Sequence, residues 1–362
     1  MVTKIAFVVV SSPNAHYIEM ALLAVFSARY WNPQAHIVLL VDDKTDALLV
    51  NERATILEYV SEKIVIPFSE DKSAYYRSRW IKTNLLRLIG GGGMLFYCDS
   101  DAIITRSLEE IDGFSCKIGA VPDAHLPVKD YCKPLADKAH RNARDVGVDL
   151  NGEMYYFNSG AIYVKICKET LEFYDKWHWI WKNQPLTLTF DQPALTKANI
   201  NCEHLIECIP DRFNCLMYTH PDFADNASIL HFAGVTHISW LYSPQLFDII
   251  QNNGIPEWLI PSLKKPTRTY FPFQYNLYKM SWKELRTTLK EMTDMAVLYG
   301  TYVDAAFTNY PVSYFFKKEA KWLLIKKKYY LAIILALMPK WVCLKLHIGK
   351  KPIPNIKFRD IS

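Results

Sequence analysis

Residues 94–105 read Met94-Leu95-Phe96-Tyr97-Cys98-Asp99-Ser100-Asp101-Ala102-Ile103-Ile104-Thr105 and follow four consecutive glycines. The short apolar run up to Cys98 predicts a strand that is buried on both faces. Asp99 and Asp101 come where this strand ends, and ligands of open α/β sheets collect at such ends. In extended backbone alternate residues point the same way, so the two carboxylates should face one point and Ser100 the other. Two such oxygens suit Mg²⁺ or Mn²⁺, although Asp and Ser are also typical of a solvated turn.

The residues before this stretch alternate between strand and helix patterns. Continuous apolar and β-branched runs predict strands at Ile5 to Val10, Ile37 to Val41 and Lys63 to Pro67. Helical patterns separate them at Ile18 to Tyr30, Asp46 to Val60 and Ser73 to Ile89. This order predicts an α/β fold, with parallel strands in this half and helices on the faces of the sheet. The loop after the first strand, Ser11 to Tyr17, should therefore lie at the same sheet edge as Asp99 and Asp101.

The region after residue 105 begins with a strand, Ile118 to Pro122, that ends in Asp123. The polar, poorly periodic stretch from Ala124 to Gly152 predicts an irregular lid. Tyr155 to Val164 predicts two short strand pieces around a polar break, within which Gly160 would let another group approach the backbone closely.

Three further elements complete this part of the chain. A tryptophan-rich helix is expected from Lys168 to Lys182. The Asp191-Gln192-Pro193 sequence predicts a helix start, and the plain alternative for Asp191 is that it caps this helix. The stretch from Ile229 to Gly234 predicts a strand that ends in His231, with Gly234 after it. A lone histidine is more often a core residue than a ligand, but one at a strand end beside glycine is a better ligand candidate.

Composition excludes several classes of protein. The chain has 362 residues, of which half are apolar, so it can bury one large core or two smaller ones. Its net charge of +5 combines +10 in residues 311–362 with −5 in the first 310, so the basic character belongs to a tail and nucleic-acid binding is not indicated. The eight cysteines form no Cys-x-x-Cys pair, and Cys202, His204, Cys208 and Cys215 match no zinc spacing, which favours reduced structural thiols in a cytoplasm.

Glycine-rich phosphate motifs are also absent from the sequence. Neither a Gly-x-Gly-x-x-Gly turn after the first strand nor a Gly-x-x-x-x-Gly-Lys-Ser/Thr loop occurs. Gly90 to Gly93 follow a helix and precede a strand, so they predict a helix C-cap and a tight turn. On the preceding helix, Arg79 and Lys82 share a face and could reach a diphosphate held by the cation, although a solvated face is the alternative.

Four motifs in this order resemble glycosyltransferase family 8. They are Asp99-x-Asp101, Phe157-Asn158-Ser159-Gly160, Asp191-Gln192, and His231-x-x-Gly234 followed by Trp240, within about Ile5 to Trp240. The resemblance implies the GT-A fold, with a Rossmann-like central mixed sheet flanked by helices. It also implies a retaining enzyme that uses nucleotide sugars.

The resemblance also implies roles for residues of this chain. Mn²⁺ would be bound by Asp99, Asp101 and His231, and the base and ribose by Ser11, Ser12, Asn14 and Tyr17. One basic residue of the helix before Asp99, either Arg79 or Lys82, would also contact the donor. Further donor contacts would come from Ser100, Gly234 and His237. The transferred sugar would lie among Asp123, Asn158, Asp191 and Gln192. Two departures stand out: the family usually shows Lys-Pro-Trp where this chain has His237-Ile238-Ser239-Trp240, and the first loop lacks an expected aspartate.

The chemistry implied is transfer of a hexose from a nucleoside diphosphate sugar, a UDP-sugar by the resemblance, to a glycan or glycolipid acceptor. The cation would neutralise the leaving diphosphate. Asp191 and Gln192, the catalytic candidates, would face the oxocarbenium-like sugar carbon, where the Gln192 oxygen would stabilise the positive charge. One alternative is a non-catalytic, membrane-associated protein that binds nucleotide sugars. Another is a sugar-1-phosphate nucleotidyltransferase, which the absence of a glycine-rich, arginine-containing loop after the first strand disfavours.

The expected domain organisation has three parts. Residues 1–245 form the catalytic domain, with the donor half up to about 105 and the acceptor half from 106; residues 246–310 form a helical or irregular extension; residues 311–362 form the tail. In the tail, aromatic residues alternate with lysine clusters, and the apolar run from Leu331 to Met338 is short of the about 20 residues that span a bilayer. We expect the tail to bind an anionic membrane surface rather than to pack on the protein or a partner. With no signal-peptide layout at the N-terminus, the protein is expected on the cytoplasmic face, peripherally attached to the inner side of the membrane.

Overall fold

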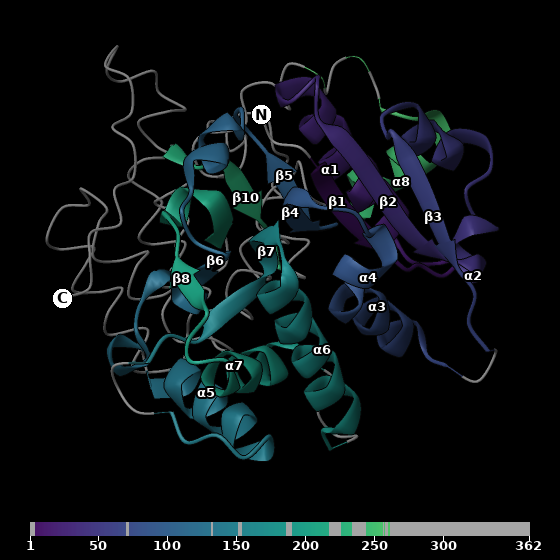
Figure 1. Cartoon of the computed structure of the whole chain (residues 1–362). Coiled ribbons are helices and arrows are strands. Elements are labelled where there is room, and N and C mark those ends of the chain that lie inside the picture. Colours follow the sequence, from purple (N-terminus) through teal and green to yellow (C-terminus); the bar gives the residue numbers. More distant parts are fainter. Residues whose placement is uncertain are drawn as a thin grey trace, which may run out of the picture.

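The computed structural model describes residues 4–69, 72–131, 133–150, 154–185, 190–216, 226–233, 244–255, 257 and 260. Its centre is a seven-stranded sheet with the order β3-β2-β1-β4-β7-β6-β8 (Figure 1). The strands are β1 (Lys4–Val9), β2 (His36–Asp42), β3 (Glu62–Ile66), β4 (Gly93–Asp99), β6 (Ile118–Pro122), β7 (Phe157–Ile166) and β8 (Ile206–Cys208). Strands β1 to β4 are parallel, as expected, and β7 runs antiparallel to both β4 and β6. The predicted fold class, a mixed central sheet flanked by helices, is confirmed.

Alternation along the strands builds a core on each face of the sheet. In β1, Ile5 and Phe7 point into one core, which includes α1 (Tyr17–Trp31), whereas Ala6 and Val8 point into the other. The second core is covered by α3 (Ala74–Thr83), α4 (Leu85–Ile89), α6 (Lys168–Asn183) and α7 (Gln192–Asn201). Because both faces are covered, the strands are apolar on both sides, which explains their continuous hydrophobic sequence.

A second, three-stranded sheet lies beside the first and is ordered β5-β10-β9. Its strands are β5 (Ala102–Ile104), β10 (Ile229–His231) and β9 (Cys215–Leu216). β10 is antiparallel to β5, with His231 opposite Ala102, and parallel to β9. The small sheet therefore brings His231 next to the end of β4.

The remaining described elements are two longer helices, α5 (Lys133–Asp145) and α8 (Pro244–Asn253), and several short helical segments. The short segments are α2 (Asp43–Asp46) and the 3₁₀ helices η1 (Asn51–Glu58), η2 (Glu109–Gly113), η3 (Asp123–His125), η4 (Val128–Asp130) and η5 (Asp211–Asn214). Helix α8 packs on α1 and η1, and its Phe247 is fully buried. No helix in the described part of the chain is long and apolar enough to cross a membrane. The tail, residues 311–362, lies outside the described residues.

Two predicted helices are interrupted. The segment from Asp46 to Val60 contains only the end of α2 and then η1, because Asn51 adopts a left-handed φ of 53° that no α-helix accommodates. The segment from Ser73 to Ile89 breaks between α3 and α4 at Asn84, whose side chain donates to the Trp80 carbonyl at 2.8 Å.

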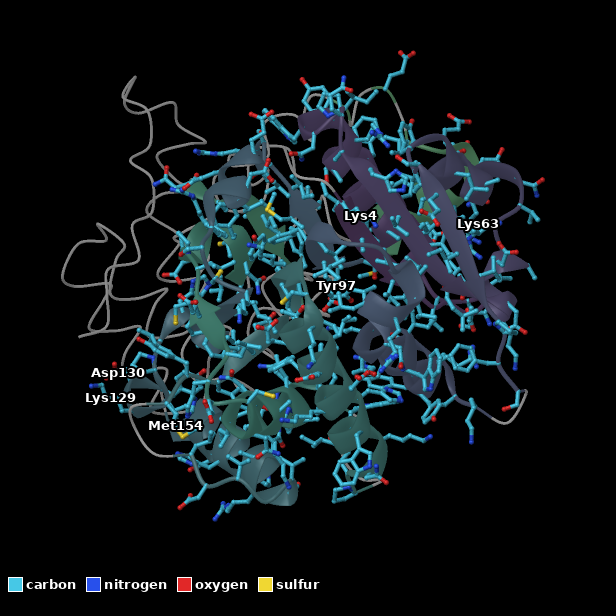
Figure 2. All side chains as sticks on the ribbon, viewed as in Figure 1. Lys4, Lys63, Tyr97, Lys129, Asp130 and Met154 are labelled. Atoms are coloured by element: carbon cyan, nitrogen blue, oxygen red, sulfur yellow. The ribbon has the colours of Figure 1, made fainter. Side chains whose placement is uncertain are left out.

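Two predictions in the second half were wrong. The stretch from Ala124 to Gly152 contains the 13-residue helix α5, whose Ala139 and Ala143 are buried over Tyr156. Alanines at i and i+4 mark a buried face only weakly, so the periodicity was missed. The polar break expected within Tyr155 to Val164 does not interrupt the strand, because β7 is continuous over ten residues. In Figure 2, Lys129, Asp130 and Met154 are labelled at the lower left of the view and Tyr97 near its middle.

Candidate functional site

The two aspartates converge at the end of β4, but not by the route that the sequence suggested. β4 ends at Asp99, and Ser100 and Asp101 form a turn rather than a continued strand. The Asp101 carbonyl then accepts from the Phe232 N–H at 2.9 Å, which ties this turn to the end of β10. The carboxylates therefore face one point because the chain turns.

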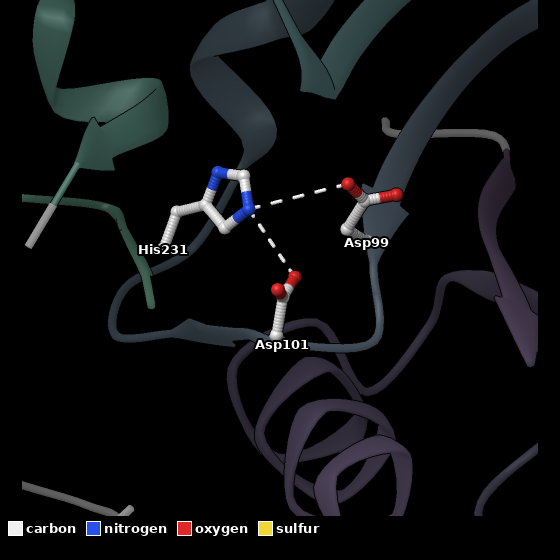
Figure 3. Close-up of side chains that lie close together, drawn as sticks. All are labelled: Asp99, Asp101 and His231. Carbon is white, nitrogen blue, oxygen red and sulfur yellow. Dashed lines mark ion pairs between the residues drawn. The ribbon is translucent and has the colours of Figure 1, made fainter. Parts of the chain in front are cut away.

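His231 completes a three-residue cluster with these carboxylates. Its Nε2 lies 3.2 Å from Asp101 Oδ1 and 4.0 Å from Asp99 Oδ2 (Figure 3). One ligand atom from each residue lies within 4.8 Å of the other two. Two carboxylates and an imidazole are a donor set that suits Mn²⁺ or Mg²⁺ with further positions left for substrate oxygens.

Gly160, in β7, provides the space for this cluster. A Cβ at this position would lie 2.8 Å from His231 Nε2 and 2.9 Å from Asp99 Oδ2, inside ordinary contact distance. The expected close approach of another group to Gly160 is confirmed, and that group is the candidate metal cluster itself. Glycine is needed at this position because any side chain would collide with the cluster, and not because of its backbone freedom.

Lys82 joins the cluster to a second carboxylate, Asp191. Its Nζ lies 3.1 Å from Asp99 Oδ1, 3.1 Å from Ser159 Oγ and 3.2 Å from Asp191 Oδ2. Burial lowers the pKa of the Lys82 ammonium, but the charges of Asp191 and Asp99 outweigh burial, and the net pKa lies above its ordinary value. Arg79 is 4.0 Å from Asp191 and stacks on the Tyr75 ring. Arg79 and Lys82 thus share a face of α3 that points into the site rather than into solvent.

Asp191 does not cap α7. It occupies the N-cap position, yet its side chain makes no capping hydrogen bond. Burial raises the pKa of the Asp191 carboxyl, but Lys82 and Arg79 more than offset this, so the net pKa is below its ordinary value. Asp191 is therefore held as a carboxylate inside the protein, which is an arrangement typical of functional sites.

Tyr97 and Ser159 belong to the site and were not predicted from the sequence. The Tyr97 hydroxyl donates to Asp99 Oδ1, whereas Oδ2 is the oxygen that faces His231. Lys82 Nζ is within hydrogen-bond distance of both oxygens. Burial raises the pKa of Tyr97 well above its ordinary range, so it stays a donor. Its position two residues before Asp99 in a strand was the available signal, because alternate residues share a face.

These groups, apart from the fully buried Tyr97, line one cleft of about 390 Å³. The predicted residues that line it are Tyr17, Arg79, Lys82, Asp99, Ser100, Asp101, Asp123, Asn158, Asp191, Gln192 and His231. Gln192 Nε2 is buried and has no hydrogen-bond partner in the described part of the chain. The cleft thus joins the cluster of three candidate ligands to an ionised carboxylate and an unsatisfied amide.

The loop after β1 contributes less than expected. Ser11 is buried, and its hydroxyl lies within hydrogen-bond distance of the carbonyls of Ser12 and Ala15 in the same loop, so it holds the loop together. Ser12 and Asn14 are exposed and are not among the described residues that line the cleft. Gly234 and His237 lie outside the described residues.

Comparison with known proteins adds solved structures of similar fold. No protein-family model matches the chain, and no curated protein matches it. The galactosyltransferase LgtC, solved with donor and acceptor sugar analogues, is 15% identical over 72% of this chain and 99% of LgtC, with a TM-score of 0.47. The bifunctional glycosyltransferase WbbM is 13% identical over 73% of this chain and 52% of WbbM, with a TM-score of 0.48. Mouse xyloside xylosyltransferase 1 is 13% identical over 64% of this chain and 98% of its own, with a TM-score of 0.39. At these identities and TM-scores, the function has to be argued from the residues of the cleft.

Proposed function

We propose that the chain is a metal-dependent glycosyltransferase that moves a hexose from a nucleoside diphosphate sugar to a glycan or glycolipid acceptor. The resemblance to family 8 extends the proposal to a UDP-sugar donor and retention at the sugar carbon. The observation that carries it is that Asp99, Asp101 and His231 share one cleft with Asp191 and Gln192.

The metal end of the cleft is suited to a diphosphate. Asp99, Asp101 and His231 would hold Mn²⁺ or Mg²⁺, whose charge would stabilise the diphosphate as its bond to the sugar breaks. Lys82 and Arg79 add fixed positive charge in a buried setting, where it acts more strongly than in water. Lys82 Nζ lies 3.1 Å from Oδ1 and 3.3 Å from Oδ2 of Asp99, so its charge is held directly beside the cluster.

The part of the cleft around Asp191 and Gln192 is suited to the transferred sugar. Asp191 remains ionised, and Gln192 offers an amide whose own hydrogen bonds are incomplete. A carboxylate and an amide oxygen there would stabilise positive charge that develops at the sugar carbon. Asp123 and Asn158 also line the cleft and would contact the sugar hydroxyl groups.

The nucleobase end is marked by exposed aromatic side chains. Tyr17, at the start of α1, and Tyr75, in α3, both line the cleft and are 48% and 42% exposed. An aromatic face open to the cleft is a stacking surface for a base. Tyr75 was not predicted from the sequence, because its pairing with Arg79 depends on the helix geometry.

The proposal is tested by donor hydrolysis with purified protein, Mn²⁺ and a panel of nucleotide sugars. We expect one donor to release nucleoside diphosphate, and the release to disappear in Asp101→Ala or after metal removal with EDTA. Asp130→Ala is the matched control, because Asp130 is exposed on η4 and away from the cleft, and it should retain full activity. Release from no donor would favour the non-catalytic binding protein. Pyrophosphate-dependent nucleotide exchange would instead identify a sugar-1-phosphate nucleotidyltransferase.

We also propose that the basic tail attaches this enzyme to the anionic inner face of a membrane. The +10 charge of residues 311–362, interspersed with aromatic residues, supports this. Vesicle co-sedimentation tests it: removal of residues 311–362 should abolish binding to vesicles rich in phosphatidylglycerol. Equal binding of the truncated and full-length chains would contradict it.

A further inference from the structure

Behind His231 lies a row of buried polar side chains that reaches from the small sheet to η3. His231 Nδ1 is 2.8 Å from Asn214 Oδ1, and Asn214 Nδ2 is 2.9 Å from Asn158 Oδ1. Asn158 Nδ2 is 3.2 Å from Asp123 Oδ1. Asn214 is fully buried and the other members of the row are at most 8% exposed. Every bond in this row is therefore made without competition from bulk water.

The direction of these bonds is fixed by a backbone group. The Gly160 N–H, which can only donate, is 2.8 Å from Asn158 Oδ1. The Asn158 atom at this point must therefore be its oxygen, and the Asn214 atom that meets the same oxygen must be a donor. Since Asn214 turns its NH₂ toward Asn158, it turns its oxygen toward His231. That oxygen accepts only if His231 carries a hydrogen on Nδ1.

Reversal of either amide is disfavoured. A reversed Asn158 would set its NH₂ against the Gly160 N–H and its oxygen against the Asp123 carboxylate. A reversed Asn214 would set two acceptors together at Asn158. In a buried row each such mismatch leaves polar atoms without partners, which is costly.

We propose that Asn214 is a positioning residue for the metal site. The Gly160 N–H fixes the orientation of the Asn158 amide, and this fixes the orientation of the Asn214 amide. The Asn214 oxygen then requires a hydrogen on His231 Nδ1, so that the bare Nε2 faces Asp99 and Asp101. In the opposite tautomer Nε2 would carry a hydrogen and donate it to Asp101, and no lone pair would face the cluster. This inference rests on the proposed function, because the cation of that reaction is what Nε2 would bind.

The fold holds Asn214 firmly in this place. It ends η5, and the next residue, Cys215, pairs with Leu230 in the small sheet. The Ser228 N–H donates to the Arg212 carbonyl at 2.7 Å, which joins η5 to the strand that carries His231. Asn214 and His231 are therefore fixed relative to each other by backbone contacts on both sides.

The first test reads the proton position in the metal-free, unaltered protein. Two-bond ¹⁵N–¹H spectra of histidine-labelled protein, recorded at a pH at which the ring is neutral, distinguish protonated from bare ring nitrogens. The signal of His231 is identified by its loss in His231→Gln. We expect Nδ1 protonated and Nε2 bare, and a hydrogen on Nε2 would overturn the proposal whether or not the protein binds metal.

The second test measures Mn²⁺ affinity by the electron paramagnetic resonance signal of free Mn²⁺. Asn214→Leu keeps the side-chain size and removes both hydrogen bonds, and it should raise the Kd for Mn²⁺ about 10–100-fold. Asn199→Leu is the matched control, because Asn199 is also buried but bonds to the Ile206 N–H away from the cluster. It should change the Kd by less than about twofold.

The outcomes separate the two proposals. Unchanged Mn²⁺ affinity in folded Asn214→Leu, checked by circular dichroism, would overturn the role of Asn214 and leave the proposed function standing. Absence of Mn²⁺ binding in the unaltered protein would contradict the proposed function, while the proton position on His231 would still decide the role of Asn214.

Discussion

Replacing Gly160 with alanine should remove metal binding while leaving the fold intact. The added Cβ would lie 2.8 Å from His231 Nε2 and 2.9 Å from Asp99 Oδ2, whereas ordinary contacts begin at 3.4 Å. The tightest contact would be with His231 Cε1 at 2.1 Å, so the imidazole ring must move by about 1.3 Å and the Asp99 carboxylate by about 0.5 Å. Both movements exceed the roughly 0.2 Å tolerance of a metal–ligand distance. We expect the Kd for Mn²⁺ to rise at least about tenfold.

The loss of unfolding free energy in Gly160→Ala should be modest, and a second glycine variant should reproduce it. Overpacking of a close-packed interior costs about 1–3 kcal/mol. Gly119→Ala supplies the control. Gly119 lies in β6 and is not among the residues that line the cleft, and an added Cβ there would lie 2.5 Å from Ile209 Cγ2. Urea denaturation should show a similar loss of unfolding free energy in both variants.

Mn²⁺ titration followed by electron paramagnetic resonance distinguishes the two variants. Gly119→Ala should bind Mn²⁺ as the unaltered protein does, and Gly160→Ala should not. If folded Gly160→Ala bound Mn²⁺ with unchanged affinity, the cluster beside Gly160 would not be the metal site. An equal loss in both variants would show that the effect comes from general destabilisation.

Two further predictions concern the charge and the aromatic face of the cleft. Lys82→Met leaves Asp191 buried without its main cation, so the free energy of unfolding at pH 7 should fall by about 3–5 kcal/mol. In the unaltered protein the lowered pKa of Asp191 stabilises the fold above about pH 4, and this contribution is lost on acidification. In Lys82→Met, burial raises the pKa of Asp191 instead, so its carboxyl takes up a proton more readily as the pH falls. The difference in unfolding free energy between the two proteins, measured by urea titration, should therefore shrink between pH 7 and pH 4.5. A deficit that does not change with pH would contradict this. Tyr17→Ala should weaken binding of UDP by about 1–3 kcal/mol in calorimetry, whereas Tyr30→Ala, at the other end of α1, should not; equal affinities would exclude stacking on Tyr17.

The sheet was predictable because its strands carry their own signal. β1, β2, β4 and β6 are continuous apolar runs, and a strand covered on both faces has this sequence wherever it occurs. Helix α5 was missed because its buried face is made of alanines. The continuity of β7 was missed because its polar residues, Asn158 and Ser159, look like a break until their buried partners are known.

The candidate site was predictable only in part. Asp99, Asp101 and His231 were grouped by a resemblance in motif order, and the structure brings them together through the pairing of β5 with β10. The available signal for Tyr97 was its alternation with Asp99 along β4, whereas Asn214 carries no local signal of its role. Asn214 contacts His231 from 17 residues away and Asn158 from 56, and such contacts depend on the whole fold rather than on any sequence window.

The most direct test of the account is Mn²⁺-dependent release of nucleoside diphosphate from a panel of nucleotide sugars. We expect release from at least one donor, its loss in Asp101→Ala, and its retention in Asp130→Ala. Release from no donor, or release that persists in Asp101→Ala, would contradict the proposal that this cleft is a metal-dependent glycosyltransferase site.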